Sequence, residues 1–287
     1  PDTELYQRDE TAEREKLAEI QSKMSAEEIE DVVRTTKELI EIQNTPDTPE
    51  ALATLPALKL EDLDKEQKLI PISEENIQNI PVLHHDLATN GILYLKMGFD
   101  LHVLPEDLLP YTALLGRVLL EMGTETEDFV KLSQRIGRDT GGIYPDAFTS
   151  TIWNSNKSAA YLFLRGKATV EQAGKLFDIL RDVLLTANLD NAERFKQIVL
   201  EEKAGLESAL IPSGHMVVHG RLQSKFHEAG WLSDKMEGID FLFFLRELAE
   251  MIENDWASVL ADLESVRDLL VNQNTLLFNI TCEADAW

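Results

Sequence analysis

The sequence predicts an α+β fold, in which a helical hairpin is followed by a mostly antiparallel sheet with helices packed on one side. Residues 92–101 place a large apolar side chain at every second position, which is typical of a long strand. Two further strand-like stretches, 142–153 and 158–166, follow each other directly. Helical patterns then occupy most of 169–270, before a last strand at 276–282. Successive hairpins with helices gathered between them favour an α+β layer over a doubly wound sheet.

Residues 1–45 are predicted to form the helical hairpin. Ser25-Ala26-Glu27-Glu28 has the pattern of a capping box, in which a serine hydroxyl and a glutamate carboxylate satisfy free N–H groups at a helix start. Apolar residues then recur on one helical face, and those of the preceding stretch would pack against them as the other arm. These residues are Ile29, Val32, Val33, Thr36 and Ile40 in the second arm, and Leu17, Ile20 and Met24 in the first. The periodicity alone also fits an ordinary charged surface hairpin.

Residues 46–75 are predicted to be an extended linker. Pro46, Pro49, Pro56 and Pro71 interrupt any long helix, because each lacks an N–H donor and restricts the residue before it. The chain is therefore expected to run extended over a surface here.

Residues 76–287 are predicted to form one α+β domain. Asn90-Gly91 is a strong turn signal before the first long strand, because both residues tolerate positive φ. A helix at 106–122 is expected to bury one face against the sheet, and a second helix follows at 125–138. The apolar stripe of the first helix consists of Leu108, Tyr111, Leu115, Val118 and Met122.

Composition argues against two classes of partner. With 287 residues, of which 44% are hydrophobic, the chain can bury a full core as one large domain or two small ones. Its formal net charge of −25 repels phosphate backbones and anionic headgroups, so neither nucleic acid nor a membrane is expected as a partner. An acidic wall would suit cationic peptides, although high net charge also maintains solubility. Cys282 is the only cysteine, which excludes an intrachain disulfide.

Two stretches, 114–124 and 141–151, carry the framework of a zinc site without its ligands. They read Leu-Leu-Gly-Arg-Val-Leu-Leu-Glu-Met-Gly-Thr and Gly-Gly-Ile-Tyr-Pro-Asp-Ala-Phe-Thr-Ser-Thr. This layout resembles the pitrilysin/insulinase zinc metallopeptidases, in which a His-x-x-Glu-His motif precedes Gly-Thr or Gly-Ser and a Gly-Gly-x-x-x-Ala-x-Thr strand follows. The motif positions fall on Leu114, Arg117 and Val118, none of which can bind zinc. The resemblance therefore implies a degenerate zinc site with no metal ligand, although this chain has one extra residue before the strand's alanine.

The resemblance runs from about Leu5 to the C-terminus and is closest to the presequence-protease branch of that family. Further matching positions are Lys167, 176–178, 193–196, 214–215 and 238–240. In that branch, four related α/β domains form two halves joined by a helical hairpin, and only the first domain carries zinc. The chain is similar to the hairpin plus the third domain. This implies a hinge at 1–45 and an inactive peptidase-like domain at 76–287.

The function that the resemblance implies is that of a non-catalytic segment of a larger zinc metalloendopeptidase, a hydrolase that degrades unfolded peptides. The segment would supply the hinge and part of the wall of a peptide-enclosing chamber. Its partners would be the remaining domains of the parent and unfolded peptides. Zinc would be bound elsewhere in the parent, and the segment alone is expected to be inactive and to hold no cofactor. The start at Pro1 and the end at Trp287 lead us to expect a piece of a longer chain.

Two further expectations follow from the resemblance. The parent would be cytoplasmic in a bacterium, and in the mitochondrial matrix or plastid stroma in a eukaryote. The alternative function, from another class, is a free-standing zinc-less binding or assembly subunit that pairs with an active peptidase subunit.

No catalytic residue is expected in this chain. The candidates for chamber or peptide contact are Gly141, Gly142, Tyr144 and Phe148, because a sheet edge there could accept an extended peptide by strand addition. If Arg117 faces the solvent-filled chamber, its replacement by alanine should have little effect.

Three other motifs carry weaker signals. His215 and His219 stand one helical turn apart, but zinc needs three or four ligands and the glutamate of a zincin helix is missing. His84-His85-Asp86 suggests a catalytic dyad, yet neighbours on an extended segment point to opposite faces. Gly141-Gly142 lacks the lysine and the following helix of a phosphate loop, and a tight turn before a strand is the simpler interpretation.

Overall fold

The computed structural model describes residues 5–66 and 68–287, which divide into a first unit ending at Lys68 and a second unit from Leu69 to Trp287. The first unit is helical. It contains α1 (Leu5–Lys23), α2 (Ala26–Asn44), α3 (Pro49–Leu52) and a 3-10 turn at Leu60–Asp62. The capping box predicted at the start of α2 is confirmed. The Ser25 hydroxyl accepts from the Glu28 N–H at 3.2 Å, and the Glu28 carboxylate accepts from the Ser25 N–H at 2.7 Å.

The packing predicted between the two arms of the hairpin is not found. Helix α2 buries no residue. Leu17 and Ile20 of α1, and Val32 and Ile40 of α2, are all about half exposed. Both helices are rich in charge, so the apolar stripe is narrow and buries little by itself. The apolar stripe of this unit is therefore exposed.

The second unit is built on a six-stranded sheet with the strand order β1-β2-β6-β3-β5-β4. The strands are β1 (Ser73–Ile77), β2 (Ile80–Asp86), β3 (Ile92–Asp100), β4 (Ile143–Thr151), β5 (Ser158–Thr169) and β6 (Leu276–Cys282). Every neighbouring pair is antiparallel except β2 and β6. These two strands are parallel, and the chain between them forms the other long strands and the helices of this unit. The predicted α+β class with a mostly antiparallel sheet is confirmed.

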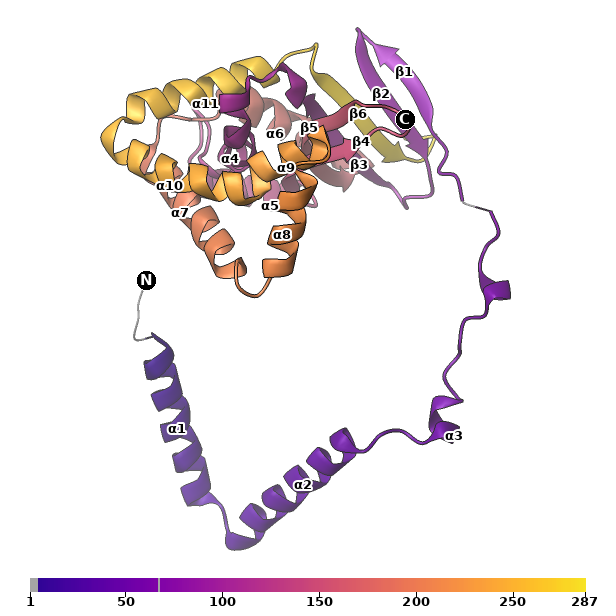
Figure 1. Ribbon diagram of the computed structural model, residues 1–287, viewed down its shortest axis with the longest axis vertical. Coiled ribbons are helices and arrows are strands. Elements are labelled where there is room, and N and C mark those ends of the chain that lie inside the picture. Colours follow the sequence, from indigo (N-terminus) through magenta and orange to yellow (C-terminus); the bar gives the residue numbers. More distant parts are fainter. Residues whose placement is uncertain (1–4, 67) are drawn as a thin grey trace. The chain divides into compact units, whose positions relative to one another are not determined.

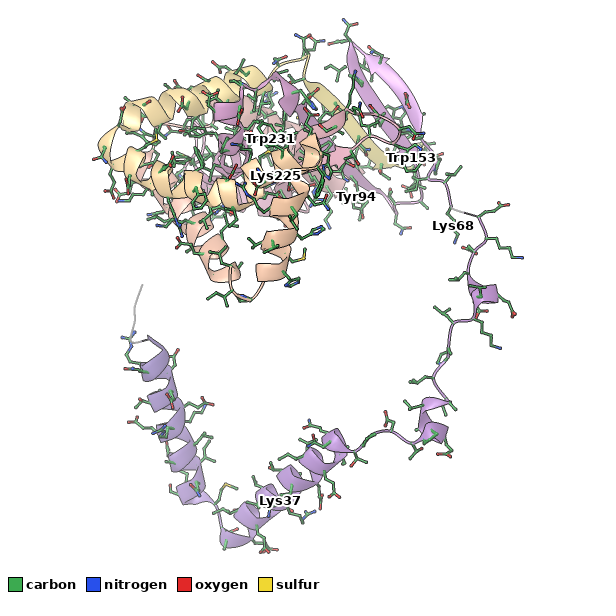
Figure 2. The ribbon with its side chains drawn as sticks, in the orientation of Figure 1. Lys37, Lys68, Tyr94, Trp153, Lys225 and Trp231 are labelled. Atoms are coloured by element: carbon green, nitrogen blue, oxygen red, sulfur yellow. The ribbon has the colours of Figure 1, made fainter. Side chains whose placement is uncertain are left out.

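Figure 1 shows the helices of the second unit gathered on one side of this sheet. They are α4 (Leu109–Glu121), α5 (Phe129–Asp139), α6 (Ala173–Thr186), α7 (Ala192–Ala209), α8 (Gly214–Gln223), α9 (Glu228–Glu237), α10 (Ile239–Asn254) and α11 (Trp256–Leu270). Short 3-10 turns occur at Leu101–Val103, Glu106–Leu108 and Val170–Gln172. Strand β3 shows the two faces: Leu95 and Phe99 are buried, whereas Tyr94, labelled in Figure 2, and Lys96 are exposed.

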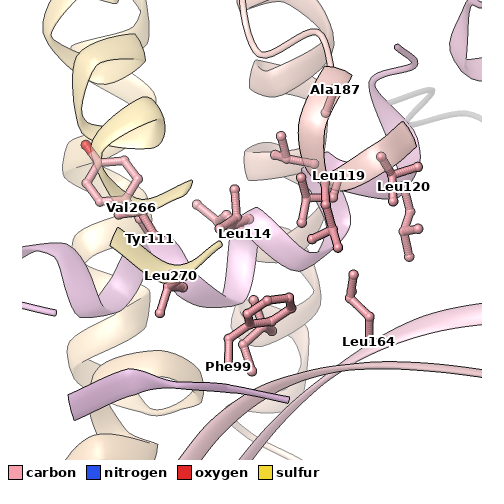
Figure 3. Close-up of a cluster of buried hydrophobic side chains, with 14 of the residues drawn as sticks. Phe99, Tyr111, Leu114, Leu119, Leu120, Leu164, Ala187, Val266 and Leu270 are labelled. Carbon is pink, nitrogen blue, oxygen red and sulfur yellow. The ribbon is translucent and has the colours of Figure 1, made fainter. Parts of the chain in front are cut away.

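Helix α4 lies at the centre of the core. Ten of its thirteen residues are buried, and the whole predicted apolar stripe from Leu108 to Met122 is among the buried residues. Figure 3 shows Leu114 and Leu119 of α4 between Phe99 and Leu164 of the sheet and Val266 and Leu270 of α11. Such a helix, apolar almost all round, can be stable only when covered on all sides.

Close approach of α4 to β4 requires a glycine. A Cβ atom at position 116 would lie 2.5 Å from the Pro145 side chain, well inside van der Waals contact. Gly116 therefore lets the helix rest directly on the strand. This contact sets the position of α4 relative to the edge of the sheet.

The Asn90-Gly91 turn is confirmed, since both residues have positive φ, at 53° and 73°. The Glu283 carboxylate accepts hydrogen bonds from the N–H groups of Thr89, Asn90 and Gly91, at 3.1, 2.9 and 3.1 Å. These bonds, that from Gly91 foremost, lower the pKa of Glu283. The segment after β6 is thereby tied to the turn before β3.

The hairpin of β1 and β2 has no counterpart in the strands expected from the sequence. Strand β1 occupies the last three residues of the range expected as a linker, 46–75, and continues to Ile77. All five of its residues are exposed, so its sequence shows no alternation of apolar and polar side chains. Its pairing is supplied by β2, which in turn pairs with β6 about 200 residues away in sequence.

Candidate functional site

The three positions that correspond to the zinc motif lie on α4 but do not form a site together. Leu114 and Val118 are completely buried in the core. Arg117 points out of the core on the side of α7, with 24% of its side chain exposed. That Arg117 faces a chamber stays a prediction, but its guanidinium is held by three carboxylates and is not freely solvated.

Arg117 is the centre of an ion-pair network that joins α4 to α7. Its Nε and Nη2 donate to the two carboxylate oxygens of Glu121 at 2.8 and 3.0 Å. Its Nη2 also donates to Glu201 at 2.9 Å, and its Nη1 to Glu202 at 3.2 Å. Arg194 of α7 donates to Glu121 at 3.1 Å and extends the network. The bonds to Glu121, and then those to Glu201 and Glu202, raise the pKa of Arg117 further above its ordinary value.

A zinc ion does not fit this arrangement. The positions of the two motif histidines hold fully buried aliphatic side chains, and a guanidinium already neutralises the carboxylates beside α4. In the part of the chain that the structure describes, no group of three or more His, Cys, Asp or Glu side chains could hold a metal ion.

Arg117→Ala is expected to lower the free energy of unfolding by about 1–3 kcal/mol, because it leaves Glu201 and Glu202 without their cation and Glu121 with Arg194 alone. We expect a smaller loss of stability than for a fully buried ion pair, because 59% of the Glu201 side chain is exposed to solvent. Urea unfolding measures it. The control is Arg181→Ala on α6, whose ion pairs are more exposed and should contribute less than about 1 kcal/mol. Equal costs for both variants would contradict the stabilising role of the network.

A groove runs beside β4, between the edge of the sheet and the helices. One hollow of about 200 Å³ is lined by Arg117, Glu202 and residues 145–147 of β4. A second hollow of about 550 Å³ is lined by residues 149–151 of β4 and by side chains of α7, α8 and α9. Leu206 and Glu237 line both hollows, so the two lie next to each other along the strand, and we call them together the groove.

The groove reaches the main chain of β4 at the free edge of the sheet. β4 is the last strand in the sheet, and three consecutive residues line each hollow. Successive side chains of the strand point to opposite faces of the sheet. The Ile152 N–H, just past β4, donates to the Lys157 carbonyl, just before β5, at 3.2 Å. Hydrogen-bonded and non-hydrogen-bonded pairs alternate along an antiparallel ladder. The N–H and C=O groups of Ala147, Thr149 and Thr151 therefore point away from β5, toward the free edge of the sheet.

The four residues predicted for peptide contact lie outside this groove. Tyr144 and Phe148 pair with Arg165 and Tyr161, on the face of the sheet opposite to the helices, and are exposed there. Their neighbours in β4, Pro145, Ala147 and Thr149, face the groove instead. A shift of one residue exchanges the two faces of a strand.

Gly141 and Gly142 form the tight turn that starts β4. The Gly141 N–H donates to the Lys167 carbonyl at 2.7 Å. Gly142 has φ +103°, and a Cβ atom there would lie 2.6 Å from the Tyr144 ring. These close contacts explain why a glycine stands at each of the two positions. Contact of any of the four residues with peptide stays a prediction.

Glu237 at the end of α9 is the groove residue that the sequence did not single out. Glu237 is exposed at the rim of the hollows, where partial loss of water raises its pKa and the negative charges of Asp146 and Glu202 raise it further. Among the described residues, Asp146 pairs with Arg165 at 3.4 Å and Glu202 pairs with Arg117, whereas no ion pair or hydrogen bond engages the Glu237 side chain. Glu237 stands alone at the end of α9, so no repeating pattern in the sequence marks it as a groove residue. Its place in the groove follows from the folded structure.

Glu237→Gln is expected to raise the melting temperature at neutral pH. A raised pKa means that the folded state binds the proton more tightly than the unfolded state, so stability falls as pH rises from the ordinary glutamate range through the raised pKa. Glutamine removes this repulsion. Thermal melts at about pH 8 should show the gain, and melts at about pH 3.5 should not. Glu264→Gln on the exposed face of α11 is the control, and an equal shift in both variants would contradict the prediction.

A Ser-His-Asp arrangement elsewhere does not make a nucleophile. The Nδ1 atom of His102 lies 2.6 Å from Asp100 and its Nε2 atom lies 3.2 Å from the Ser158 hydroxyl. The Ser158 hydroxyl, however, donates to Glu228 at 2.7 Å and is buried. An activated serine must give its proton to histidine. The cluster therefore ties the start of β5 to the start of α9, which forms one wall of the groove.

The histidines named from the sequence are not brought together as ligands. His215 and His219 lie on α8, and His219 lines the larger hollow. His84 is buried in β2, where its ring stacks on Trp287 at 4.4 Å between centroids. His85 points to the opposite face of the sheet, and its Nδ1 contacts the Pro71 carbonyl at 2.8 Å. The structure thus gives the rings of His84 and His85 structural contacts.

Comparisons with known proteins agree with the geometry. The family model described as peptidase M-16C associated matches residues 1–248. The chain is 36% identical over 283 residues to "Presequence protease 1, chloroplastic/mitochondrial" of Arabidopsis thaliana, covering 99% of this chain and 26% of that protein. It is 34% identical to "Protein HypA" of Clostridium perfringens, covering 93% of this chain and 27% of that protein. The chain thus spans about a quarter of the length of the curated relatives it matches.

A solved structure supports the fold independently. A conserved protein from Enterococcus faecalis V583 superposes with a TM-score of 0.51 at 16% identity, covering 72% of this chain and 48% of that chain. At this identity the likeness shows the fold alone. The family model and the presequence proteases together show that this chain belongs to the peptidase-associated family of that model, in the presequence-protease branch of the pitrilysin/insulinase metallopeptidases.

Proposed function

We propose that this chain is a non-catalytic segment of a presequence-protease-like zinc metallopeptidase, and that it contributes a hinge and part of the wall enclosing the peptide. The observation that carries the proposal is that the positions which the resemblance assigns to a zinc motif hold two buried aliphatic side chains and an ion-paired arginine. Zinc and the hydrolytic step belong to another domain of the parent. The helical hairpin at 1–45 is the proposed hinge, and its exposed apolar stripe is available to the other domains.

The remaining domains of the parent are the proposed partners of the second unit. The matched region makes up about a quarter of each curated relative, which favours a segment over a free-standing subunit. Trp153, between β4 and β5, is 89% exposed and labelled in Figure 2. A fully exposed tryptophan is a common anchor of protein interfaces.

Unfolded peptides are the proposed ligands of the wall. The free edge of β4 offers main-chain donors and acceptors, and the groove beside it accepts side chains. The relatives named as chloroplastic or mitochondrial support an organellar parent if the source is a eukaryote. Among the described helices, none is long and apolar enough to cross a membrane.

The test combines cleavage, metal content and binding on the purified 287-residue chain. It should contain no stoichiometric zinc and should leave a quenched peptide intact with or without added zinc. It should nevertheless bind unstructured peptides and protect the outward amides of Ala147 and Thr149 from hydrogen exchange. Chelator-sensitive cleavage would overturn the non-catalytic assignment. Absence of peptide binding, or binding without this protection, would overturn the wall contact at β4.

A further inference from the structure

We propose that Asn90-Gly91, the turn before β3, is a site of spontaneous deamidation, and that Glu283 slows the reaction in the folded chain by holding the turn. The product is aspartate or isoaspartate at position 90, and its formation loosens the segment that follows β6. The reaction needs no peptide and no other domain, so it is independent of the proposed function.

The chemistry of deamidation depends on the asparagine and on the residue that follows it. The main-chain nitrogen of Gly91 attacks Cγ of Asn90, a C–N bond forms, and the side-chain nitrogen leaves as ammonia with the proton of the Gly91 amide. Water then opens the cyclic imide at either carbonyl carbon and gives aspartate or isoaspartate. Gly91 has no Cβ to hinder the attack. Asn90 is exposed and, among the described residues, no hydrogen bond engages its side chain, so the side chain is available to react.

In the folded chain the main chain of Gly91 is held at both ends. Its N–H donates to the Glu283 carboxylate at 3.1 Å, and its C=O accepts from the Val170 N–H at 3.0 Å. Attack requires the nitrogen to lose its proton and to rotate toward Cγ of Asn90. The Glu283 carboxylate opposes both steps, because it accepts that proton in a hydrogen bond and its negative charge disfavours ionisation of the amide. The folded turn should therefore react more slowly than a free Asn-Gly sequence.

The Glu283 contact is also an anchor of the C-terminal segment after β6. Glu283 binds three N–H groups at once, those of residues 89–91. The next residue, Ala284, donates its N–H to Asp86 at 3.0 Å. The turn and the C-terminal segment therefore hold each other, and a change in one affects the other.

Deamidation changes this contact in two ways. Isoaspartate lengthens the main chain of the turn by one carbon, so the N–H groups of residues 89–91 no longer converge on a single carboxylate. Either product also places a negative charge on the residue whose N–H donates to Glu283 at 2.9 Å. The like charges repel, and the anchor of the C-terminal segment weakens.

The experiment follows deamidation in the purified 287-residue chain at mildly alkaline pH. Digestion after lysine yields residues 69–96 as one peptide, and mass spectrometry distinguishes its asparagines at positions 76, 79 and 90. Asn79 is the internal control, because it also has positive φ, at 69°, but precedes an isoleucine, whose branched side chain hinders attack. Asn90 should react and Asn79 should not. At Asn90 the folded chain should react at least about tenfold more slowly than the chain unfolded in guanidinium chloride.

Three variants test the role of Glu283. Glu283→Ala should raise the rate at Asn90 in the folded chain about tenfold. Glu283→Gln keeps an acceptor without the charge, so its rate should fall between those of Glu283→Ala and the wild type. Asp285→Ala is the matched control, since it removes an exposed carboxylate of the same segment that no described residue binds, and should keep the wild-type rate. Thermal melts establish that each variant is folded.

Asn90→Asp imitates the aspartate product and tests its effect on the C-terminal segment. The amide of Ala284 should exchange its hydrogen faster in this variant than in the wild type, because the neighbouring anchor is weakened. Asn79→Asp, at the other turn, should leave that exchange unchanged.

Each part of the proposal can be overturned by its own result. Absence of modification at Asn90 in the unfolded chain, or equal modification of Asn79, would overturn the site. A folded wild type that reacts as fast as the unfolded chain, or a Glu283→Ala variant that keeps the wild-type rate, would overturn the protection by Glu283. Equal exchange of the Ala284 amide in Asn90→Asp and the wild type would overturn the loosening of the C-terminal segment.

Discussion

Leu115→Ala is expected to lower the free energy of unfolding of the second unit by about 3–5 kcal/mol, the upper part of the range for buried leucines. Leu115 has no exposed surface and lies on α4, the helix that is buried on nearly all sides. Neighbouring side chains cannot easily move into the cavity, because the close contact of Gly116 with Pro145 holds α4 against β4. Urea unfolding followed by circular dichroism measures the change.

The matched control is Leu185→Ala on α6, where the same atoms are removed from a side chain that is 63% exposed. That variant should cost less than about 1 kcal/mol. A cost for Leu115→Ala as small as that of the control would mean that α4 is not the centre of the core. The comparison is independent of any assumption about activity.

The burial of α4 was predictable from the sequence because it depends on local periodicity. Leu108, Tyr111, Leu115, Val118 and Met122 recur at helical spacing, and all five are buried. The hairpin of β1 and β2 was not predictable in this way. β1 is exposed throughout, and the position of β2 in the sheet depends on parallel pairing with β6, which no local pattern encodes.

The candidate site was predictable only in part. The sequence indicated β4 as a strand that could accept a peptide, and the structure places β4 at the free edge of the sheet. Which face of β4 meets the groove could not be read from the sequence, because the strand has no clear alternation of buried and exposed residues. The ion pairs of Arg117 with Glu201 and Glu202 join residues more than 80 positions apart, so the carboxylates could not be assigned before the fold was known.

Rebuilding the zinc motif in this chain, with Leu114→His, Arg117→Glu and Val118→His together, is expected to lower the free energy of unfolding by more than about 5 kcal/mol. Leu114 and Val118 are completely buried, so each new imidazole would lose its water in an apolar core. The glutamate at position 117 would join Glu121, Glu201 and Glu202, so that four carboxylates would repel one another with Arg194 beside them. Thermal melts should show a much lower transition temperature, or none.

Metal is the decisive control for this triple variant. Added zinc stabilises a folded state only if it binds that state, and the shift in melting temperature then grows with zinc concentration. We expect no such shift and no cleavage of a quenched peptide, because aligned ligands also need supporting contacts that this core does not provide. Leu114→Ala with Val118→Ala measures the cost of lost packing alone, and Arg117→Glu alone measures the cost of the charge. A triple variant that is more stable than the sum of these costs predicts, and that cleaves peptide until a chelator is added, would show that the catalytic geometry survives in this domain and that only its ligands were lost.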